Sequence, residues 1–454
     1  MTEIVYRSAA PGVYGFSPAA VRNTGQRRNR YTWMMALRPV TVALAGADGG
    51  TEFQCLDIPD EFYAVRVGFM NITTTPWDVT LIKAVGSGPT SSYVVPVDDD
   101  GNTLAASDWS TLTSVNAGAN VSEIVTVAGA STALEVLANT TDTATGETGN
   151  PAWTMTDWVP CQSRGADPVT GMRRLMIRAL IPSSQSVGYN SVLANSVWPG
   201  NPTLNRGYVA WTGGRDNNAD YVTDPTTGNS LTNTGNNPLV SGNLIAMIQV
   251  LTRKPCVQGM HTGDSTMAGT GTTASIYTMS LMSAIDLGKE FIGVVPVSNC
   301  CAATGGEASG VFFARMQTLL PIVEPTYCIL PGWTSNDFNV DGLTPDEMEA
   351  YFSARQRNAA DVCREAGVVP IFVTPWGYDA MTDAYRVAWK ALRARVLSLT
   401  ESGNVVVDQF ALCGNTATGE YDTGMAADGI HPGDEANTRA TQVLTRAIKA
   451  VAGL

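Results

Sequence analysis

Two short segments carry residue types suited to nucleophilic chemistry. The stretch GMHTGDSTMAGTG (residues 259–271) places Ser265 after a Gly-Asp pair, and MAADGIHPGDEA (residues 425–436) places His431 three residues after Asp428. A serine hydroxyl is a poor nucleophile at neutral pH unless a neighbouring base accepts its proton, and that base is usually a histidine held by a carboxylate. The two segments together predict a serine nucleophile activated in this way.

Only two histidines occur in the 454 residues, so few bases can be considered. His261 lies four residues before Ser265 in a strand-like segment, and an extended chain would separate the two by roughly 13 Å. We therefore assign His261 to the structure or to the pocket wall. The spacing of Asp428 and His431 allows one turn to bring the carboxylate beside one imidazole nitrogen, leaving the other nitrogen for the serine. We expect Asp428 to orient His431, His431 to remove and return the proton, and Ser265 to form an acyl-enzyme.

An ester also requires donors for the negative charge that develops on its carbonyl oxygen. The segment NCCAATGGE offers a backbone N–H at Gly305 or Gly306, of which Gly305 is preferred. The segment PGWTSNDF offers the amide of Asn336, and the backbone N–H of Ser265 is a third candidate. Each motif taken singly could be only a turn or a helix cap. A purely structural interpretation would have to hold for the serine turn, the histidine loop and the asparagine loop together.

Side chains for substrate contact are indicated less sharply. Trp333 and Trp376 follow strand-like segments, where an indole could line an acyl or sugar pocket, although packing in the core or at the rim is an equal alternative. Gly306 joins them as a candidate because it lacks a side chain that would block substrate.

The elements that must position these residues change in character near residue 250. Downstream, five apolar runs are each followed by a helical stretch, which predicts a parallel sheet covered on both faces. Thr344 and Glu347 form a capping box around Pro345, and Gly367 follows that helix. A closing helix after Gly433 should bury one face, composed of Ala440, Val443, Leu444, Ala447, Ile448 and Val451. The five runs are CVQGMHT, FIGVVPVS, PTYCILP, VVPIFVTP and NVVVDQF.

Upstream, short apolar or alternating stretches are separated by turn-rich segments, as in an all-β protein. They include YAVRVGFMNIT, WDVTLIKAV, RRLMIRALI and YVAWTGG. We therefore expect residues 1–250 to form a β-rich accessory domain, a jelly-roll-like β-sandwich with a substrate-binding or rim role, and residues 251–454 to form the catalytic domain. Polar segments at 97–150 and 216–238 should be long surface loops.

The composition excludes several classes of partner. The formal net charge of −13 disfavours nucleic acid and anionic membrane surfaces, and no apolar run approaches the roughly 20 residues of a membrane helix. No signal-peptide layout opens the chain, which predicts a cytoplasmic protein by default, or a secreted or periplasmic one if a leader was removed. The basic run GQRRNR (residues 25–30) is interpreted as a solvated loop or as a strap that forms salt bridges to the catalytic domain.

The cysteines and histidines argue against metal or disulfide chemistry. Eight cysteines include no Cys-x-x-Cys pair, so all eight are treated as reduced. Two histidines are too few for a histidine-based metal cluster.

Together these residues resemble the four blocks of the SGNH (GDSL-type) hydrolases over residues 255–454. The blocks are Gly263-Asp264-Ser265 with Gly269, the glycine loop at 305–306, Asn336-Asp337, and Asp428-x-x-His431-Pro432. The resemblance implies a flavodoxin-like three-layer α/β/α fold with a five-stranded parallel sheet, and ester hydrolysis, often of acyl groups on sugars, with no metal or organic cofactor. The third block usually reads Gly-x-Asn-Asp, whereas Gly332 here stands four residues before Asn336. No Gly-x-Ser-x-Gly elbow occurs, which argues against the α/β-hydrolase fold.

The first functional hypothesis is therefore a serine carboxylic ester hydrolase that removes short acyl groups, such as acetyl, from a carbohydrate or a small ester. One alternative is a lipase or thioesterase for longer acyl chains. Another, of a different class, is a glycan-binding, cell-surface or virion structural protein that uses the hydrolase-like domain as a scaffold. The oligomeric state and the natural acyl donor are left open.

Overall fold

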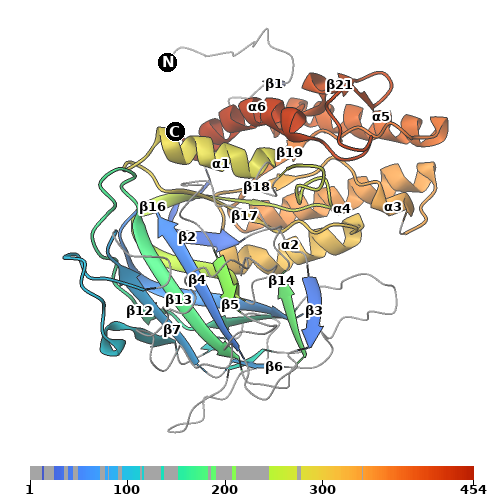
Figure 1. The fold of residues 1–454 in the computed structure, drawn as a ribbon. Coiled ribbons are helices and arrows are strands. Elements are labelled where there is room, and N and C mark those ends of the chain that lie inside the picture. The colour runs from blue at the N-terminus through green and yellow to red at the C-terminus, as the bar shows by residue number, and fades with distance from the viewer. Residues whose placement is uncertain are drawn as a thin grey trace. The chain divides into compact units, whose positions relative to one another are not determined.

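The chain forms two compact units in the computed structural model (Figure 1). Unit 1 comprises Met1–Arg28, Val257–Glu290 and Val297–Leu454, and unit 2 comprises Asn29–Cys256 and Phe291–Pro296. The structure describes residues 13–14, 25–34, 39–43, 50–71, 77–79, 81–89, 95–112, 115–116, 134–136, 152–181, 186–190, 207–210, 245–273, 278–339 and 341–454.

Unit 1 contains a mostly parallel sheet at its centre. Five strands pair in parallel in the order β17-β16-β18-β19-β20, and the short strand β1 pairs antiparallel with β20 at the edge. Each parallel strand except the long β16 is three to five residues of almost wholly buried side chains, as expected for a sheet covered on both faces. The strands are β1 (Val13–Tyr14), β16 (Ile245–His261), β17 (Val297–Cys301), β18 (Tyr327–Leu330), β19 (Val369–Val373) and β20 (Val405–Val407).

Helices cover this sheet in two groups, which lie on either side of its strands in Figure 1. Helix α1 packs against α6, while α4 packs against both α2 and α5. The helices are α1 (Met279–Glu290), α2 (Ser309–Val323), α3 (Asn336–Asn339), α4 (Pro345–Glu365), α5 (Asp383–Ser398) and α6 (Asp434–Ala452). Short elements complete the unit: the 3-10 turns η6 (Leu399–Ser402) and η7 (Phe410–Leu412), and the hairpin β21 (Gly414–Asn415) and β22 (Glu420–Tyr421).

Two of the predicted helix signals are confirmed. Helix α4 begins after Thr344, whose side chain and that of Glu347 form the expected capping box, and Gly367 beyond its end has a φ of +72°. Helix α6 begins directly after Gly433 and buries the apolar face predicted from its periodicity.

The described part of unit 2 consists of strands, connecting segments and one 3-10 turn, η2 (Ala106–Asp108). One antiparallel sheet has the order β15-β4-β13-β7-β8, and the first half of β16 pairs antiparallel with β5, followed by β11 and β9. The jelly-roll connectivity stays a prediction. The strands are β2 (Arg28–Met34), β3 (Pro39–Ala43), β4 (Gly50–Ile58), β5 (Phe62–Asn71), β6 (Trp77–Val79), β7 (Leu81–Ser87), β8 (Ser110–Leu112), β9 (Val115–Asn116), β10 (Leu134–Val136), β11 (Ala152–Thr156), β12 (Val159–Pro160), β13 (Arg173–Ile181), β14 (Ser186–Asn190) and β15 (Gly207–Ala210).

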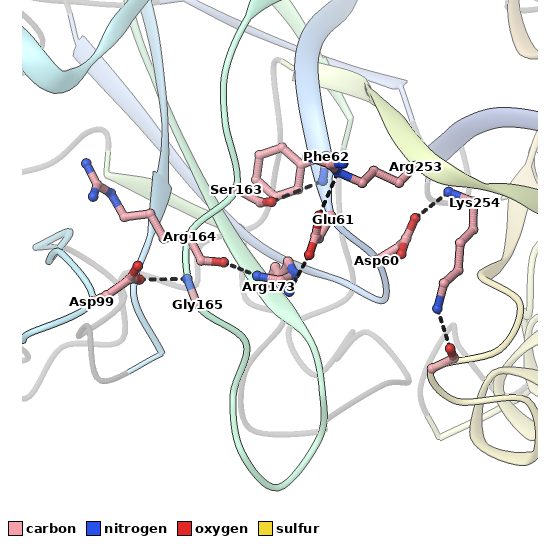
Figure 2. A network of polar contacts seen from close by, with 11 residues as sticks. Asp60, Glu61, Phe62, Asp99, Ser163, Arg164, Gly165, Arg173, Arg253 and Lys254 are labelled. Atoms are coloured by element: carbon pink, nitrogen blue, oxygen red, sulfur yellow. Dashed lines mark hydrogen bonds and ion pairs between the residues drawn. The ribbon is translucent and has the colours of Figure 1, made fainter.

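Polar contacts hold the middle of β16 to the turn between β4 and β5 (Figure 2). Glu61 binds Arg253 at 2.6 Å and Arg173 at 3.0 Å, and Asp60 accepts the N–H of Lys254 at 2.7 Å. The stretch from Arg253 to Lys254 is extended within one 17-residue strand, and these contacts hold it in place.

The basic run at 25–30 makes contacts of the strap type within unit 1. Arg27 Nε donates to the Ala452 carbonyl at 3.0 Å, and Arg28 Nε lies 3.3 Å from Glu324 Oε2. All eight cysteines are buried free thiols. None of the helices in the described ranges combines the length and apolar composition of a membrane span. The polar segment at 216–238 and most of 97–150 lie outside the described residues.

Candidate active site

Ser265 lies in the tight turn that follows β16 at the carboxyl end of the parallel sheet. Gly263 has a φ of +143°, a conformation that other residues rarely adopt. The buried carboxylate of Asp264 accepts a hydrogen bond from the Thr266 N–H at 2.9 Å and another from the Thr334 hydroxyl. Asp264 therefore fixes the shape of the turn and ties it to the loop after β18.

His431 joins Ser265 to Asp428 in one hydrogen-bonded line. Its Nε2 lies 2.9 Å from Ser265 Oγ, and its Nδ1 lies 2.7 Å from Asp428 Oδ2. Because an ionised carboxylate can only accept, Nδ1 carries the proton and Nε2 accepts from the serine hydroxyl. Gly271 permits the close approach, since a Cβ there would lie 2.6 Å from His431 Cβ. The structure thus brings together the three side chains named as a triad from the sequence.

The local hydrogen bonds keep Asp428 ionised. Burial opposes its charge, but the backbone N–H and the ring of His431, together with the Ile430 N–H, lower the pKa of this carboxyl below its usual value. Both backbone donors bind Oδ1, at 2.9 Å for His431 and 3.0 Å for Ile430. Asp428 Oδ2 is therefore left for the imidazole, in the charge state that favours a protonated Nδ1.

Neighbouring segments also anchor the histidine loop. The Asp379 N–H donates to the Gly429 carbonyl at 2.8 Å, and the Tyr421 hydroxyl donates to the Ile430 carbonyl at 3.2 Å. The loop after β19 and strand β22 therefore hold the two residues that precede His431.

A glycine-bearing loop lies beside the serine. A Cβ built on Gly305 would have Ser265 Cβ, at 3.7 Å, as its only described neighbour within 4 Å, whereas one built on Gly306 would have none. Both glycines are exposed. Asn336 Nδ2 donates to the Glu307 carbonyl at 3.0 Å, which uses one of its two amide hydrogens. The loop that contains Gly305 and the start of α3, at Asn336, are therefore hydrogen-bonded to each other.

Asp337 holds the start of helix α2 from beneath this loop. Its Oδ1 accepts the Ser309 N–H at 2.7 Å, and the side chain has no exposed surface. Burial raises the pKa of Asp337 to about 6, although the bonds from Ser309 and the nearby guanidinium of Arg355 act in the opposite direction.

This raised pKa predicts a pH-dependent effect of Asp337→Asn on stability. The native protein becomes less stable as the pH rises from 3.8 through 6, because the Asp337 carboxyl must then ionise in the interior. The free energy of unfolding falls by about 3 kcal/mol in full. An amide does not ionise, so the variant should gain stability relative to the native chain by up to that amount between pH 4 and pH 7. Denaturant unfolding of both proteins at the two pH values measures this difference, and an equal difference at both would contradict the prediction.

His261 is part of the interior. Its Nε2 lies 3.2 Å from the Met267 carbonyl, and its Nδ1 lies 3.5 Å from Asn299 Oδ1. Burial lowers the pKa of His261 to about 4, so the ring is neutral at physiological pH. Its position ties β16 to the serine turn and to β17.

The two tryptophans named as candidate substrate contacts are also interior. Trp333 has 6% and Trp376 has 3% of its surface exposed. Trp333 packs near Phe338, and the Trp376 carbonyl accepts from Trp389. Of the three candidates, only Gly306 is exposed.

A buried ion pair beneath the glycine loop was not foreseen from the sequence. The guanidinium of Arg315, on α2, contacts both the Glu307 carboxylate and the Thr304 hydroxyl. The available signal was an arginine in the otherwise apolar run VFFARMQTLL. Within the described ranges, no three His, Cys, Asp or Glu side chains are grouped so that they could hold a metal ion.

No protein-family model matches the chain, and neither does any curated protein. Solved structures that it resembles include a GDSL-like lipase from Bacteroides thetaiotaomicron VPI-5482, at 14% identity and a TM-score of 0.34, covering 42% of this chain and 88% of that one. An acetyl xylan esterase from Geobacillus stearothermophilus has 14% identity and a TM-score of 0.35, covering 42% and 94%. A lipase/acylhydrolase from Enterococcus faecalis has 18% identity and a TM-score of 0.33, covering 42% and 95%.

Proposed function

We propose that the chain is a serine carboxylic ester hydrolase in which Ser265, His431 and Asp428 act as the catalytic triad. The observation that carries the proposal is the continuous line of contacts, 2.9 Å from Ser265 Oγ to His431 Nε2 and 2.7 Å from His431 Nδ1 to Asp428 Oδ2. Both distances lie within hydrogen-bonding range: the first lets the Ser265 proton pass to His431, and the second lets Asp428 orient the imidazole.

Acylation would proceed as follows. The Ser265 Oγ attacks the carbonyl carbon of the ester as its proton passes to His431 Nε2, and Asp428 stabilises the imidazolium that forms. When the tetrahedral intermediate collapses, the bond to the alcohol oxygen breaks and His431 returns the proton to that alcohol. A water molecule, deprotonated by the same imidazole, then attacks the acyl carbon; the bond to Ser265 Oγ breaks, the acid leaves, and His431 returns the proton to Ser265 Oγ. The proposal involves no metal or organic cofactor.

The charge on the carbonyl oxygen would be stabilised by the backbone N–H groups of Ser265 and Gly305 and by the Asn336 amide. Support for Gly305 over Gly306 comes from its place beside the Ser265 side chain. Support for Asn336 comes from its bond to the Glu307 carbonyl, which orients one amide hydrogen and leaves a second for substrate. Losing one such donor typically raises the barrier by about 2.7 to 4 kcal/mol.

The proposed substrate is an ester with a short acyl group, preferably acetyl, on a carbohydrate or small alcohol. The acyl preference derives from the sequence resemblance. Support for a bulky alcohol comes from the exposed Gly305–Gly306 loop, whose two residues have no side chains of their own beside Ser265.

A series of 4-nitrophenyl esters from acetate to decanoate tests this preference. We expect kcat/KM to be highest for acetate and to fall by about tenfold or more by the octanoate ester, because a short acyl pocket cannot accommodate the added methylenes without strain. The rate of the uncatalysed reaction with each ester provides the control. A maximum at long chains would replace the acetyl proposal with a lipase or thioesterase.

A further inference from the structure

The glycine loop that would supply an oxyanion donor has little packing of its own. Gly306 has a φ of +82° and no described atom within 4 Å of its Cβ position, and Gly305 has only Ser265. Glycine is the most flexible residue in the unfolded chain and gains no side-chain contacts on folding. The orientation of the Gly305 N–H must therefore be imposed from the two ends of the loop.

One side chain contacts both ends. The Nη1 of Arg315 donates to Thr304 Oγ1, immediately before the glycines, and its Nη2 pairs with Glu307 Oε2, immediately after them. All three side chains are at least 97% buried. Further bonds come from the Thr304 N–H to the Gly263 carbonyl at 3.1 Å, and from the Asn336 amide to the Glu307 carbonyl.

We propose that Arg315 is a positioning residue for ester hydrolysis, which holds the Gly305 N–H at the carbonyl oxygen by fixing Thr304 and Glu307 in one planar fork. This inference rests on the proposed function. The fork matters because guanidinium donors diverge in a rigid plane, whereas a lysine ammonium is a compact point charge on a flexible stem. A donor displaced by about 1 Å from the developing charge loses much of its effect on the rate.

The variant Arg315→Lys tests whether Arg315 positions the glycine loop or only neutralises the charge of Glu307. The lysine keeps a positive charge beside Glu307, so no carboxylate is left buried and unpaired, but it cannot also reach the Thr304 hydroxyl in the same geometry. We expect kcat for 4-nitrophenyl acetate to fall by about tenfold or more with KM within about twofold, because an oxyanion donor acts in the transition state and not in the ground state. The pH at which kcat/KM falls on the acid side should not move, because the triad is untouched.

The chain supplies a matched control in Arg393, on α5. It forms a similar pair with the buried carboxylate of Asp408, which also accepts the Thr374 hydroxyl at 2.8 Å, at the ends of β19 and β20. Arg393→Lys should cost comparable thermal stability and leave kcat within about twofold of the native value. Thr304→Val provides a second arm that keeps the Arg315 ion pair intact; it should lower kcat in the same manner even if Arg315→Lys folds poorly.

The results of these experiments test the role of Arg315 separately from the proposed ester hydrolysis. Positioning by Arg315 is supported if kcat falls for both Arg315→Lys and Thr304→Val but not for Arg393→Lys. KM, and the pH at which kcat/KM falls on the acid side, should both be unchanged. If the native protein hydrolyses the ester but both loop variants keep the kcat of Arg393→Lys, or lose activity only through a raised KM, the inference is overturned and the triad proposal stands. A folded native protein with no esterase activity would overturn the proposed function, and this inference with it.

Discussion

Replacing Ser265 by alanine is expected to lower kcat for 4-nitrophenyl acetate by about 10⁵-fold or more. The alanine removes the hydroxyl oxygen that lies 2.9 Å from His431 Nε2, so the acyl-enzyme cannot form, and substrate binding and the oxyanion donors are left to assist water. The measurement is steady-state hydrolysis, with circular dichroism and thermal unfolding to show that the fold is kept.

Ser402→Ala is the matched control, because it deletes the same hydroxyl at an exposed position on η6. It should retain native activity. Hydrolysis by Ser265→Ala at more than a few per cent of the native rate would exclude an acyl-enzyme at this serine.

Asp428→Asn is expected to lower kcat/KM by about 10³-fold with little change in KM. Asparagine is neutral and can offer an N–H to the imidazole, which favours the wrong tautomer and removes the support for the imidazolium. The expected loss is smaller than for a fully buried aspartate because the Asp428 side chain is 52% exposed and water can replace part of its effect.

The control for this variant is Asp422→Asn, which removes an equal charge from the same connecting segment at an exposed residue. Its activity should match that of the native chain at several ionic strengths. If the two variants lose activity equally, the effect of Asp428 would be one of general charge, and its orienting role would be wrong.

Much of the regular structure of unit 1 could be predicted because its signals are local. The capping box at Thr344 and the apolar face of α6 each depend on residues within a few turns of one another. Four of the five parallel strands coincide with the predicted apolar runs, since strands covered on both faces need no alternation. The run FIGVVPVS was wrong: residues 291–294 form a turn with Ile292 and Val294 exposed, and the strand is β17, Val297–Cys301.

The middle of β16 could not be predicted in the same way. The sequence Arg253-Lys254-Pro255 interrupts the apolar pattern, and the strand remains extended there because Glu61 and Asp60, almost 200 residues earlier, bind its side chain and backbone. Contacts between residues so far apart in the sequence produce no local sequence pattern.

Residue types and the scarcity of histidine were enough to name Ser265, His431 and Asp428, and the structure brings them within hydrogen-bonding distance. The contacts of Arg315 with the two ends of the glycine loop could not be predicted in the same way. Arg315 and Glu307 are eight residues apart, and only the fold shows that one guanidinium contacts both flanks of the glycine loop.

The most direct test of the proposed proton path is covalent labelling with a fluorophosphonate, followed by peptide mapping by mass spectrometry. Ser265 Oγ would displace fluoride from phosphorus as its proton passes to His431. The predicted result is a single adduct on the peptide that contains Ser265, lost in Ser265→Ala and formed much more slowly in Asp428→Asn. A folded native protein that takes up no label, or is labelled at another residue, would contradict the assignment of Ser265 as an activated nucleophile.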